Sequence, residues 1–488
     1  MMDLFKYTAP EITVLAFALV IVLVDLFSSR KGVLPLLAVV GALIASGFCV
    51  MLWGGAGSES FYKMITIDQF GLFFKLLILA AVILVVLASY KYVLKFDKFQ
   101  GEYYALLLLS SIGLMLLVSS VNLITIYLSL ELSSISLYAL VSFLKDKQSS
   151  EAGLKYLILG AVASAVLLYG MALVFGMTGS TCLTCISDFL KAAPANELLS
   201  MPVLLTGLIL VIAGFGFKIA SVPFQMWVPD VYEGAPTPVT AYLSVASKAA
   251  GFAVITRILL TAFGVPTWIH FEWGVIIAVL AALTMTFGNL VAVVQTNIKR
   301  LLGYSSIAQA GYLMVGLAAM GMAAQSDAVV RSGLLFFLFS YTLTNLGAFI
   351  AIIAISNRIN SDMIDDYAGM GKRAPLLALG LTLCLVSLTG LPPTAGLIAK
   401  IYIFSGAVNQ GLIWLVIIAV INSVISAYYY FKVVKAMWLA EPKSDEKVAA
   451  SWPEWLALAF CCIVVVIAGV VPGIFIAFAQ SAAKIFGA

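Results

Sequence analysis

Long apolar runs separated by short polar segments make up most of the chain. A membrane-spanning helix needs about 20 consecutive, mostly apolar residues, and fourteen runs meet that requirement. The pattern therefore predicts an all-α membrane protein with about fourteen transmembrane helices. The predicted spans are residues 10–27, 33–53, 70–90, 103–119, 121–142, 153–177, 203–222, 239–264, 273–294, 299–322, 330–356, 374–404, 408–437 and 454–480.

Two of the predicted spans are interrupted by glycine and proline. The seventh ends in GFGFKIASVP and leads into a Pro/Gly-rich loop over residues 223–238, and the twelfth contains SLTGLPPTAGLIAK. Proline removes a backbone donor and glycine weakens a helix, so we expect helices 7 and 12 to be discontinuous. They lie five spans apart and so cross in opposite directions. Paired broken helices indicate an inverted repeat with ion sites near the membrane midplane.

We therefore expect a single polytopic membrane domain over residues 1–488, with two inverted five-helix repeats inside it. Residues 1–100 would hold helices 1–3, residues 101–265 the first repeat (helices 4–8), and residues 266–440 the second repeat (helices 9–13). Residues 441–488 would hold a loop and helix 14.

Composition and charge agree with a membrane protein and give an orientation. Of 488 residues, 63% are apolar and 10% charged, whereas soluble domains carry about 25% charged residues. With the N-terminus outside, 17 of the 27 Lys and Arg residues fall in inward loops, five in outward segments and five within spans. Inward loops carry the positive excess, so both termini are predicted outside. These charges lie in short loops, and we expect a lipid environment and no nucleic-acid partner.

Four ionisable residues are predicted deep in the membrane: Glu131, Lys218, Lys248 and Lys400. A charge at the bilayer centre costs about 2.5 to over 10 kcal/mol, so each is a functional-site candidate. A snorkelling side chain or a static ion pair is the alternative. Lys75 and Arg257 lie closer to outer span ends, and for them we expect snorkelling.

A buried glutamate and buried lysines near broken helices are suited to proton transfer. Burial disfavours a protonated lysine and a nearby carboxylate favours it, so a Glu131–Lys218 pair would hold a proton and its separation would release the proton towards Lys248. Broken helices provide free carbonyls and room for water. Polar residues that could line such a path are Ser133, Ser134, Thr240, Ser244, Ser247, Tyr304, Ser305, Ser306, Gln309 and Thr394.

The sequence lacks motifs for redox or nucleotide chemistry. It contains no phosphate-binding P-loop, no Rossmann glycine motif, no haem attachment site and no iron–sulfur ligand cluster. Cys182 and Cys185 form a CxxC in a loop, for which a disulfide and two free thiols both remain open. We expect no bound metal or cofactor, and energy must come from a partner subunit or an ion gradient.

Three stretches resemble a known family. MWVPDVYEGAPTPVTAYLSVASKAAGFAV (226–254), QTNIKRLLGYSSIAQAGYLMVG (295–316) and LTGLPPTAGLIAK (388–400) are similar to the subunit N family of bacterial respiratory complex I, the proton-translocating NADH:quinone oxidoreductase. This family belongs to the antiporter-like membrane subunits. Glu131 resembles the glutamate of the family's fifth helix, and the resemblance extends over residues 60–440.

The resemblance implies that Glu131 and Lys218 are a coupled pair, Lys248 a connecting lysine and Lys400 the lysine of the exit half-channel. It implies a translocase subunit in a bacterial inner membrane, beside the antiporter-like subunit M and the small subunits K and J. NADH, FMN, iron–sulfur clusters and quinone would bind partner subunits. The alternatives are an Mrp-type cation/proton antiporter subunit and the pump subunit of a related hydrogenase or ferredoxin-linked complex.

Overall fold

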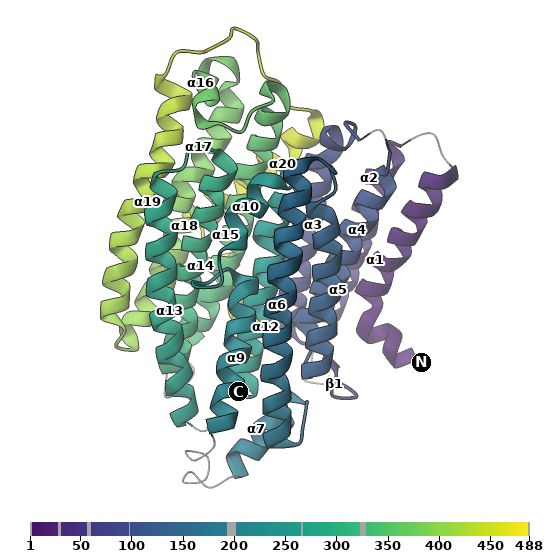
Figure 1. Ribbon diagram of the computed structural model, residues 1–488, viewed down its shortest axis with the longest axis vertical. Helices are drawn as coiled ribbons and strands as arrows, with labels where there is room; N and C mark the ends of the chain where they lie inside the picture. The colour runs from purple at the N-terminus through teal and green to yellow at the C-terminus, as the bar shows by residue number, and fades with distance from the viewer. Residues whose placement is uncertain are drawn as a thin grey trace.

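The computed structural model describes residues 2–27, 31–55, 60–96, 98–192, 202–264, 267–322 and 328–486. Almost all of them are helical, and the helices run along the long axis of the molecule (Figure 1). Thirteen helical stretches in these residues are long and apolar enough to cross a membrane. The shorter helices α17 and α18 together make one more crossing, so the predicted fourteen-helix membrane fold is confirmed.

The helices follow one another along the chain. Up to the first break they are α1 (Met2–Phe27), α2 (Val33–Trp53), α3 (Gln69–Val93), α4 (Gln100–Ser119), α5 (Leu123–Val141), α6 (Lys147–Thr178), α7 (Leu183–Ala192) and α9 (Pro202–Ile219). The next are α10 (Trp227–Gly234), α11 (Thr237–Tyr242), the π-helix η1 (Leu243–Ser247), α12 (Lys248–Thr261), α13 (Thr267–Val293), α14 (Ile298–Met322) and α15 (Ala328–Ile359). The last are η2 (Ile364–Tyr367), α16 (Met370–Arg373), α17 (Pro375–Thr389), α18 (Ala395–Asn409), α19 (Ile413–Leu439), α20 (Trp452–Val470), α21 (Gly473–Ala483) and η3 (Lys484–Phe486).

One small β-hairpin lies at the lower end of the bundle in Figure 1, near α7. Strands β1 (Ser60–Phe61) and β2 (Ile65–Thr66) pair antiparallel. Isolated bridges continue the pairing from Ile65 to Ser120 and from Asn122 to Cys182. This end of the molecule thus joins the segments before α3, α5 and α7.

Burial separates a central layer of helices from a lipid-facing rim. In α14, α15 and the α11–α12 crossing, 94% of the residues in the apolar stretch are buried inside the chain. In α1, α2, α6, α19 and α20 the share is 28–33%. Rim helices expose large apolar side chains such as Leu26 and Val424, as lipid contact requires. Every backbone group in hydrocarbon needs an internal partner, which explains why the crossings are helical.

Helices 7 and 12 are discontinuous, as predicted, but the first break differs in detail. Helix α9 continues through Gly214 and Gly216 to Ile219, and the helix is interrupted at Ala220, whose φ is +63°. Lys218 therefore lies in the last turn before the break, not after it. The predicted loop over 223–238 is largely helical, because α10 forms the second half of helix 7. The predicted single helix over 454–480 also divides, at Pro472, into α20 and α21.

The broken helices of the two repeats have equivalent packing partners. Helix α6 packs along α9 and α10, and α15 packs along α17 and α18. Each broken helix thus lies against the third helix of its own repeat. The second repeat also packs on α3, α20 and α21, which surround α15. This arrangement places both breaks beside the buried core.

Candidate functional site

Glu131 projects from α5 and is half-buried. The hydroxyl of Ser164 on α6 donates a hydrogen bond to its carboxylate and lies 3.3 Å from the Tyr127 hydroxyl. The predicted direct pair with Lys218 is not formed. Instead, the Lys218 ammonium donates to Ser134 Oγ at 3.2 Å, one helical turn along α5 from Glu131. Ser134 therefore ties Lys218 to the helix that carries Glu131.

Lys218 is 4% exposed and lies where α9 ends. The negative end of a helix dipole stabilises a cation in this last turn. Its aliphatic stem lies against Gly251 of α12, where an added Cβ would be 3.4 Å from Lys218 Cγ. Gly251 is one turn beyond Lys248 on α12. The first helix break therefore brings Lys218 to the helix that carries Lys248.

Lys248 is 3% exposed and follows directly after the π-helix η1, a distortion that often marks functional sites. Its ammonium donates to the carbonyl oxygen of Ser306 and, at 2.5 Å, to Ser306 Oγ. It also lies 5.6 Å from the ring centroid of Tyr341. The hydroxyls of Tyr341 and Tyr232 contact Ser306 Oγ at 2.8 and 3.2 Å. No carboxylate is among these partners.

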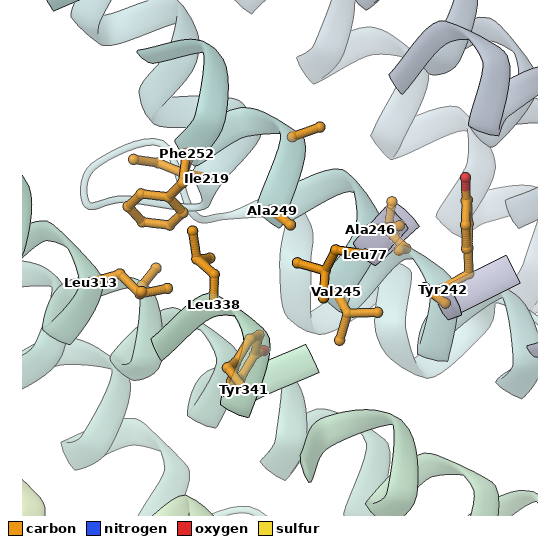
Figure 2. Packing of buried hydrophobic residues seen from close by; sticks show 14 of the residues in the cluster. Leu77, Ile219, Tyr242, Val245, Ala246, Ala249, Phe252, Leu313, Leu338 and Tyr341 are labelled. Carbon is orange, nitrogen blue, oxygen red and sulfur yellow. The ribbon is translucent and has the colours of Figure 1, made fainter. Parts of the chain in front are cut away.

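Apolar side chains from three crossings face one another around this site. Figure 2 shows Val245, Ala249 and Phe252 along η1 and α12, facing Leu313 of α14 and Leu338 of α15. Such a layer excludes lipid and bulk water and strengthens each electrostatic interaction within it. Polar contacts of Lys248 are therefore confined to Ser306 and the tyrosines that surround it.

Lys400 lies in α18, directly after the second break, and is 5% exposed. Its ammonium donates to the carbonyl oxygens of Leu388 and Thr389, at 3.3 and 2.8 Å, and to Ser423 Oγ at 3.2 Å. The last carbonyls of a helix have no partner within it. The break in helix 12 thus frees two carbonyls of α17, which bind the cation 4.5 Å from the ring centroid of Tyr312.

A track of polar groups joins Lys248 to Lys400. Ser305 lies next to Ser306 and shares a hydrogen bond with the Tyr430 hydroxyl. That hydroxyl is 3.5 Å from Gln309 Nε2, which also donates at 3.0 Å to the Leu388 carbonyl. Lys400 donates to the same carbonyl. Two lysines from different repeats are therefore connected through α14, α19 and the end of α17.

Polar groups of η1, the turn directly before Lys248, also contact α15. Asn345 Nδ2 donates to Ser244 Oγ at 2.7 Å. The buried atoms Ser247 Oγ and Asn345 Oδ1 have no hydrogen-bond partner among the described residues. Buried polar atoms are rarely left unpaired, and ordered water often satisfies them.

The other polar residues predicted to line the path have local contacts. Ser133 Oγ, Thr240 Oγ1 and Thr394 Oγ1 donate to backbone carbonyls of Leu130, Tyr232 and Leu391, and the Tyr304 ring packs near Phe287. These contacts stabilise α5, α10 and the second break. They do not bring these four residues into contact with any of the lysines.

Lys75 and Arg257 do not snorkel, contrary to the sequence-based expectation. Lys75 is 1% exposed and pairs with Glu11 of α1 at 2.8 Å. Arg257 is 3% exposed and binds both oxygens of Asp68 at 2.7 and 2.9 Å. Glu11 lies within α1 and Asp68 caps α3, so the pairing of either base could not be anticipated from its distance to a span end.

The chain matches a known family over most of its length. The family described as NADH:quinone oxidoreductase/Mrp antiporter, transmembrane, matches residues 120–426. This chain belongs to that family. The matched segment contains all four predicted ionisable residues, from Glu131 on α5 to Lys400 on α18.

Curated members of this family include close relatives. A protein of Dehalococcoides mccartyi named NADH-quinone oxidoreductase subunit N is 48% identical over 473 residues, which is 96% of this chain and 97% of that protein. A protein of the same name from Heliobacterium modesticaldum is 45% identical over 431 residues, 88% of each chain. The predicted resemblance to the subunit N family is thus confirmed.

Solved structures of the family share the fold. A chain of respiratory complex I from Thermus thermophilus with bound aureothin superposes with a TM-score of 0.79 at 30% identity, covering 96% of this chain and 98% of that one. A chain of the archaeal membrane-bound sulfane sulfur reductase gives 0.87 at 25% identity, covering 99% and 97%. A chain of the Mrp complex from Dietzia gives 0.80 at 19% identity, covering 98% and 97%, a likeness of fold alone.

Several residues in this family site had not been identified from the sequence. Ser164 contacts Glu131, and Ser423 contacts Lys400. Tyr232 and Tyr341 contact Ser306 beside Lys248, and Tyr430 contacts Ser305 and Gln309 of the polar track. Single hydroxyls in apolar helices are common and carry no spacing signal. The one available cue is that Tyr430 and Tyr429 interrupt an apolar run, which does not specify a partner.

Gly390 makes room for Lys400 and is expected to be sensitive to substitution. Its φ is +89°, and an added Cβ would lie 2.9 Å from Lys400 Cδ. Gly390→Ala should therefore lower stability by about 1–2 kcal/mol from backbone strain and also displace the lysine, reducing proton transport. Proton uptake by membrane vesicles measures the second effect.

Gly411→Ala is the matched control for this prediction. Gly411 has a φ of +78°, and an added Cβ would have no neighbour within 4 Å. Gly411→Ala should lower stability through the same backbone strain but leave proton transport normal. Equal transport in the two variants, at equal amounts of assembled protein, would contradict the role assigned to the Lys400 position.

Proposed function

We propose that this chain is the proton-translocating subunit N of a bacterial NADH:quinone oxidoreductase, and that Glu131, Lys218, Lys248 and Lys400 carry the translocated protons. The family membership and the 48% identity to a protein named subunit N support the assignment. The buried lysines support the transport role, because an ammonium placed in a membrane without need is costly.

The polar track between Lys248 and Lys400 carries this proposal. Each lysine donates to neutral oxygens rather than to a carboxylate, so no ion pair has to be broken for it to lose its proton. Hydroxyl and amide groups lie at intervals that hydrogen-bonded water can bridge. The break in helix 12 provides the free carbonyls of Leu388 and Thr389 at the Lys400 end of this route.

In the proposed cycle, the position of Glu131 relative to Lys218 controls the first transfer. When the carboxylate acts strongly on Lys218, the ammonium form is favoured. A change in the Ser164 and Ser134 contacts would weaken that interaction and let the proton move towards Lys248. The energy for this change would come from redox chemistry in other subunits, because we expect this chain to bind no NADH, FMN, iron–sulfur cluster or quinone.

We also propose where the chain lies in the cell and in the complex. The thirteen apolar helices and the split crossing establish a membrane protein. We propose an inner-membrane location with both termini outside, next to the antiporter-like subunit M and the small subunits K and J. The division into residues 1–100, 101–265, 266–440 and 441–488 also remains a prediction.

A related respiratory complex with another electron donor is the alternative. The superposition on the archaeal sulfane sulfur reductase chain, with a TM-score of 0.87, favours it. Sequence identity favours subunit N instead, with 48% against 25%. Proton uptake that depends on NADH distinguishes the two assignments.

Replacement of Tyr430 tests the polar track. Tyr430→Phe removes the hydroxyl between Ser305 and Gln309 while keeping the buried ring. We expect NADH-driven proton uptake by inverted membrane vesicles to fall several-fold, with assembly on a native gel unchanged. The cause is the loss of the one side chain that joins the two halves of the track.

Tyr428→Phe provides the matched control, because Tyr428 lies on the same helix and is 65% exposed. It should retain normal uptake. If Tyr430→Phe assembles and pumps as Tyr428→Phe does, the polar track does not carry protons.

A further inference from the structure

Two cysteines outside the proton path lie together at the lower end of the bundle. Cys182 precedes α7 and Cys185 lies in its first turn, and both are free thiols. The amide of Cys185 donates to Cys182 Sγ at 3.4 Å, and Thr184 Oγ1 lies 3.1 Å from the same sulfur. The Cα atoms of residues three apart in a helical turn lie about 5 Å apart, within the Cα–Cα range that a disulfide spans.

A cation from a separate segment completes the cluster. Lys63, in the turn between β1 and β2, places Nζ 3.5 Å from Cys185 Sγ. A nearby ammonium stabilises a thiolate, which is the reactive form of cysteine. Cys182 is 7% exposed and Cys185 is half-buried, so reagents reach Cys185 first.

The environment of Cys182 also favours its thiolate. Burial raises the pKa of this thiol, but hydrogen bonds from Cys185 and Thr184 outweigh burial and hold the pKa below its usual value. A CxxC at the start of a helix with a neighbouring cation has the features of an exchangeable dithiol. The other four cysteines lie in membrane helices, three of them buried, and none of them belongs to a CxxC sequence.

We propose that Cys182 and Cys185 form a reversible dithiol–disulfide site that exchanges with disulfides of small thiols or of thiol:disulfide oxidoreductases. In the first step, the Cys185 thiolate attacks a disulfide RSSR, forms a mixed disulfide and releases RS⁻. In the second, the Cys182 thiolate attacks Cys185 Sγ and releases a second RS⁻. The pair is oxidised by two electrons, and RSSR is reduced to two thiolates, each cysteine having lost one proton.

The oxidation state of the cysteine pair affects the contacts of neighbouring segments, including the start of α5. Asn122, which bridges to Cys182, caps the N-terminus of α5, the helix that carries Glu131. A disulfide would withdraw Cys185 Sγ from Lys63 and Cys182 Sγ from the Cys185 amide. Oxidation therefore changes the contacts between the hairpin and α7. In the proposed orientation this end faces outside, where disulfides persist.

The test uses the assembled complex in native membranes. Samples are equilibrated with oxidised and reduced glutathione at a series of ratios, quenched with acid, unfolded and labelled with a maleimide that adds visible mass. Wild type should lose two labels cooperatively on oxidation, and the peptide containing residues 182–185 should lose the mass of two hydrogen atoms. Cys182→Ser should instead retain a mixed disulfide on Cys185.

Lys63 provides a second, independent readout. Lys63→Ala should slow labelling of Cys185 by a membrane-impermeant maleimide several-fold, and Lys63→Arg should restore the rate. A wild-type protein that keeps both labels at the most oxidising ratio would overturn the proposal, as would label loss at the other four cysteines alone. Either failure would leave the proton-transport function intact, because the pair contacts none of the four proposed carriers.

Discussion

Lys218→Ala is expected to abolish most NADH-driven proton uptake, lowering its rate by at least roughly tenfold, since a positioned proton-transfer group contributes that much or more. The side chain is buried where α9 ends, beside Gly251 of α12 and bonded to Ser134 of α5. No neighbouring lysine can replace it at this break. Coupled NADH:quinone activity should fall with uptake, and assembly on a native gel should remain normal.

Lys218→Arg separates a proton carrier from a static charge. Arginine keeps the positive charge and can still donate to Ser134, but it does not release its proton. This variant should therefore fail like Lys218→Ala. Recovery of uptake in Lys218→Arg would show that the site needs a charge and not a transferable proton.

Two further substitutions define the specificity of the effect. Lys248→Ala should lose uptake like Lys218→Ala, because Lys248 is the next buried lysine, and its ammonium binds Ser306 and lies over the Tyr341 ring. Lys191→Ala is the matched control, since Lys191 is exposed on α7. Normal assembly and uptake in both buried variants would require withdrawal of the pumping role for this chain.

Arg257→Ala is expected to destabilise the fold by about 3–5 kcal/mol, the usual cost of leaving a buried charge unpaired. Arg257 binds Asp68 through two nitrogens and also donates to the Val118 carbonyl at 2.9 Å. It thus ties α12 to the start of α3 and the end of α4. The expected result is loss of assembled complex on a native gel and earlier aggregation on heating.

A double substitution distinguishes charge pairing from packing. Asp68 also caps α3 by accepting from the Gly71 amide at 2.6 Å, and asparagine can keep that cap. Arg257→Met with Asp68→Asn removes both charges and should recover most of the lost stability. The exposed Arg358→Ala should behave like wild type. A double variant no more stable than Arg257→Ala would rule out the unpaired charge as the cause.

The sequence alone determined the number of crossings and the two broken helices, and it predicted the depth of the four ionisable residues. Each follows from a local property. In hydrocarbon a backbone segment must satisfy its own hydrogen bonds, so any apolar run of sufficient length is helical whatever its neighbours. Proline and glycine indicate a break near their own positions, although the first break falls at Ala220 and not at Gly214 or Gly216. The family likewise followed from contiguous motifs between residues 226 and 400.

Only the tertiary structure decided which groups these residues contact. Lys248 meets Ser306 from α14, Lys400 meets carbonyls released at the end of α17, and Glu131 meets Ser164 rather than Lys218. Lys75 and Arg257 pair with acids from distant helices, and α10 is helical because it packs between α6 and α14. These contacts depend on which helix faces meet, and hydropathy along one segment contains no information about the neighbour it will pack against.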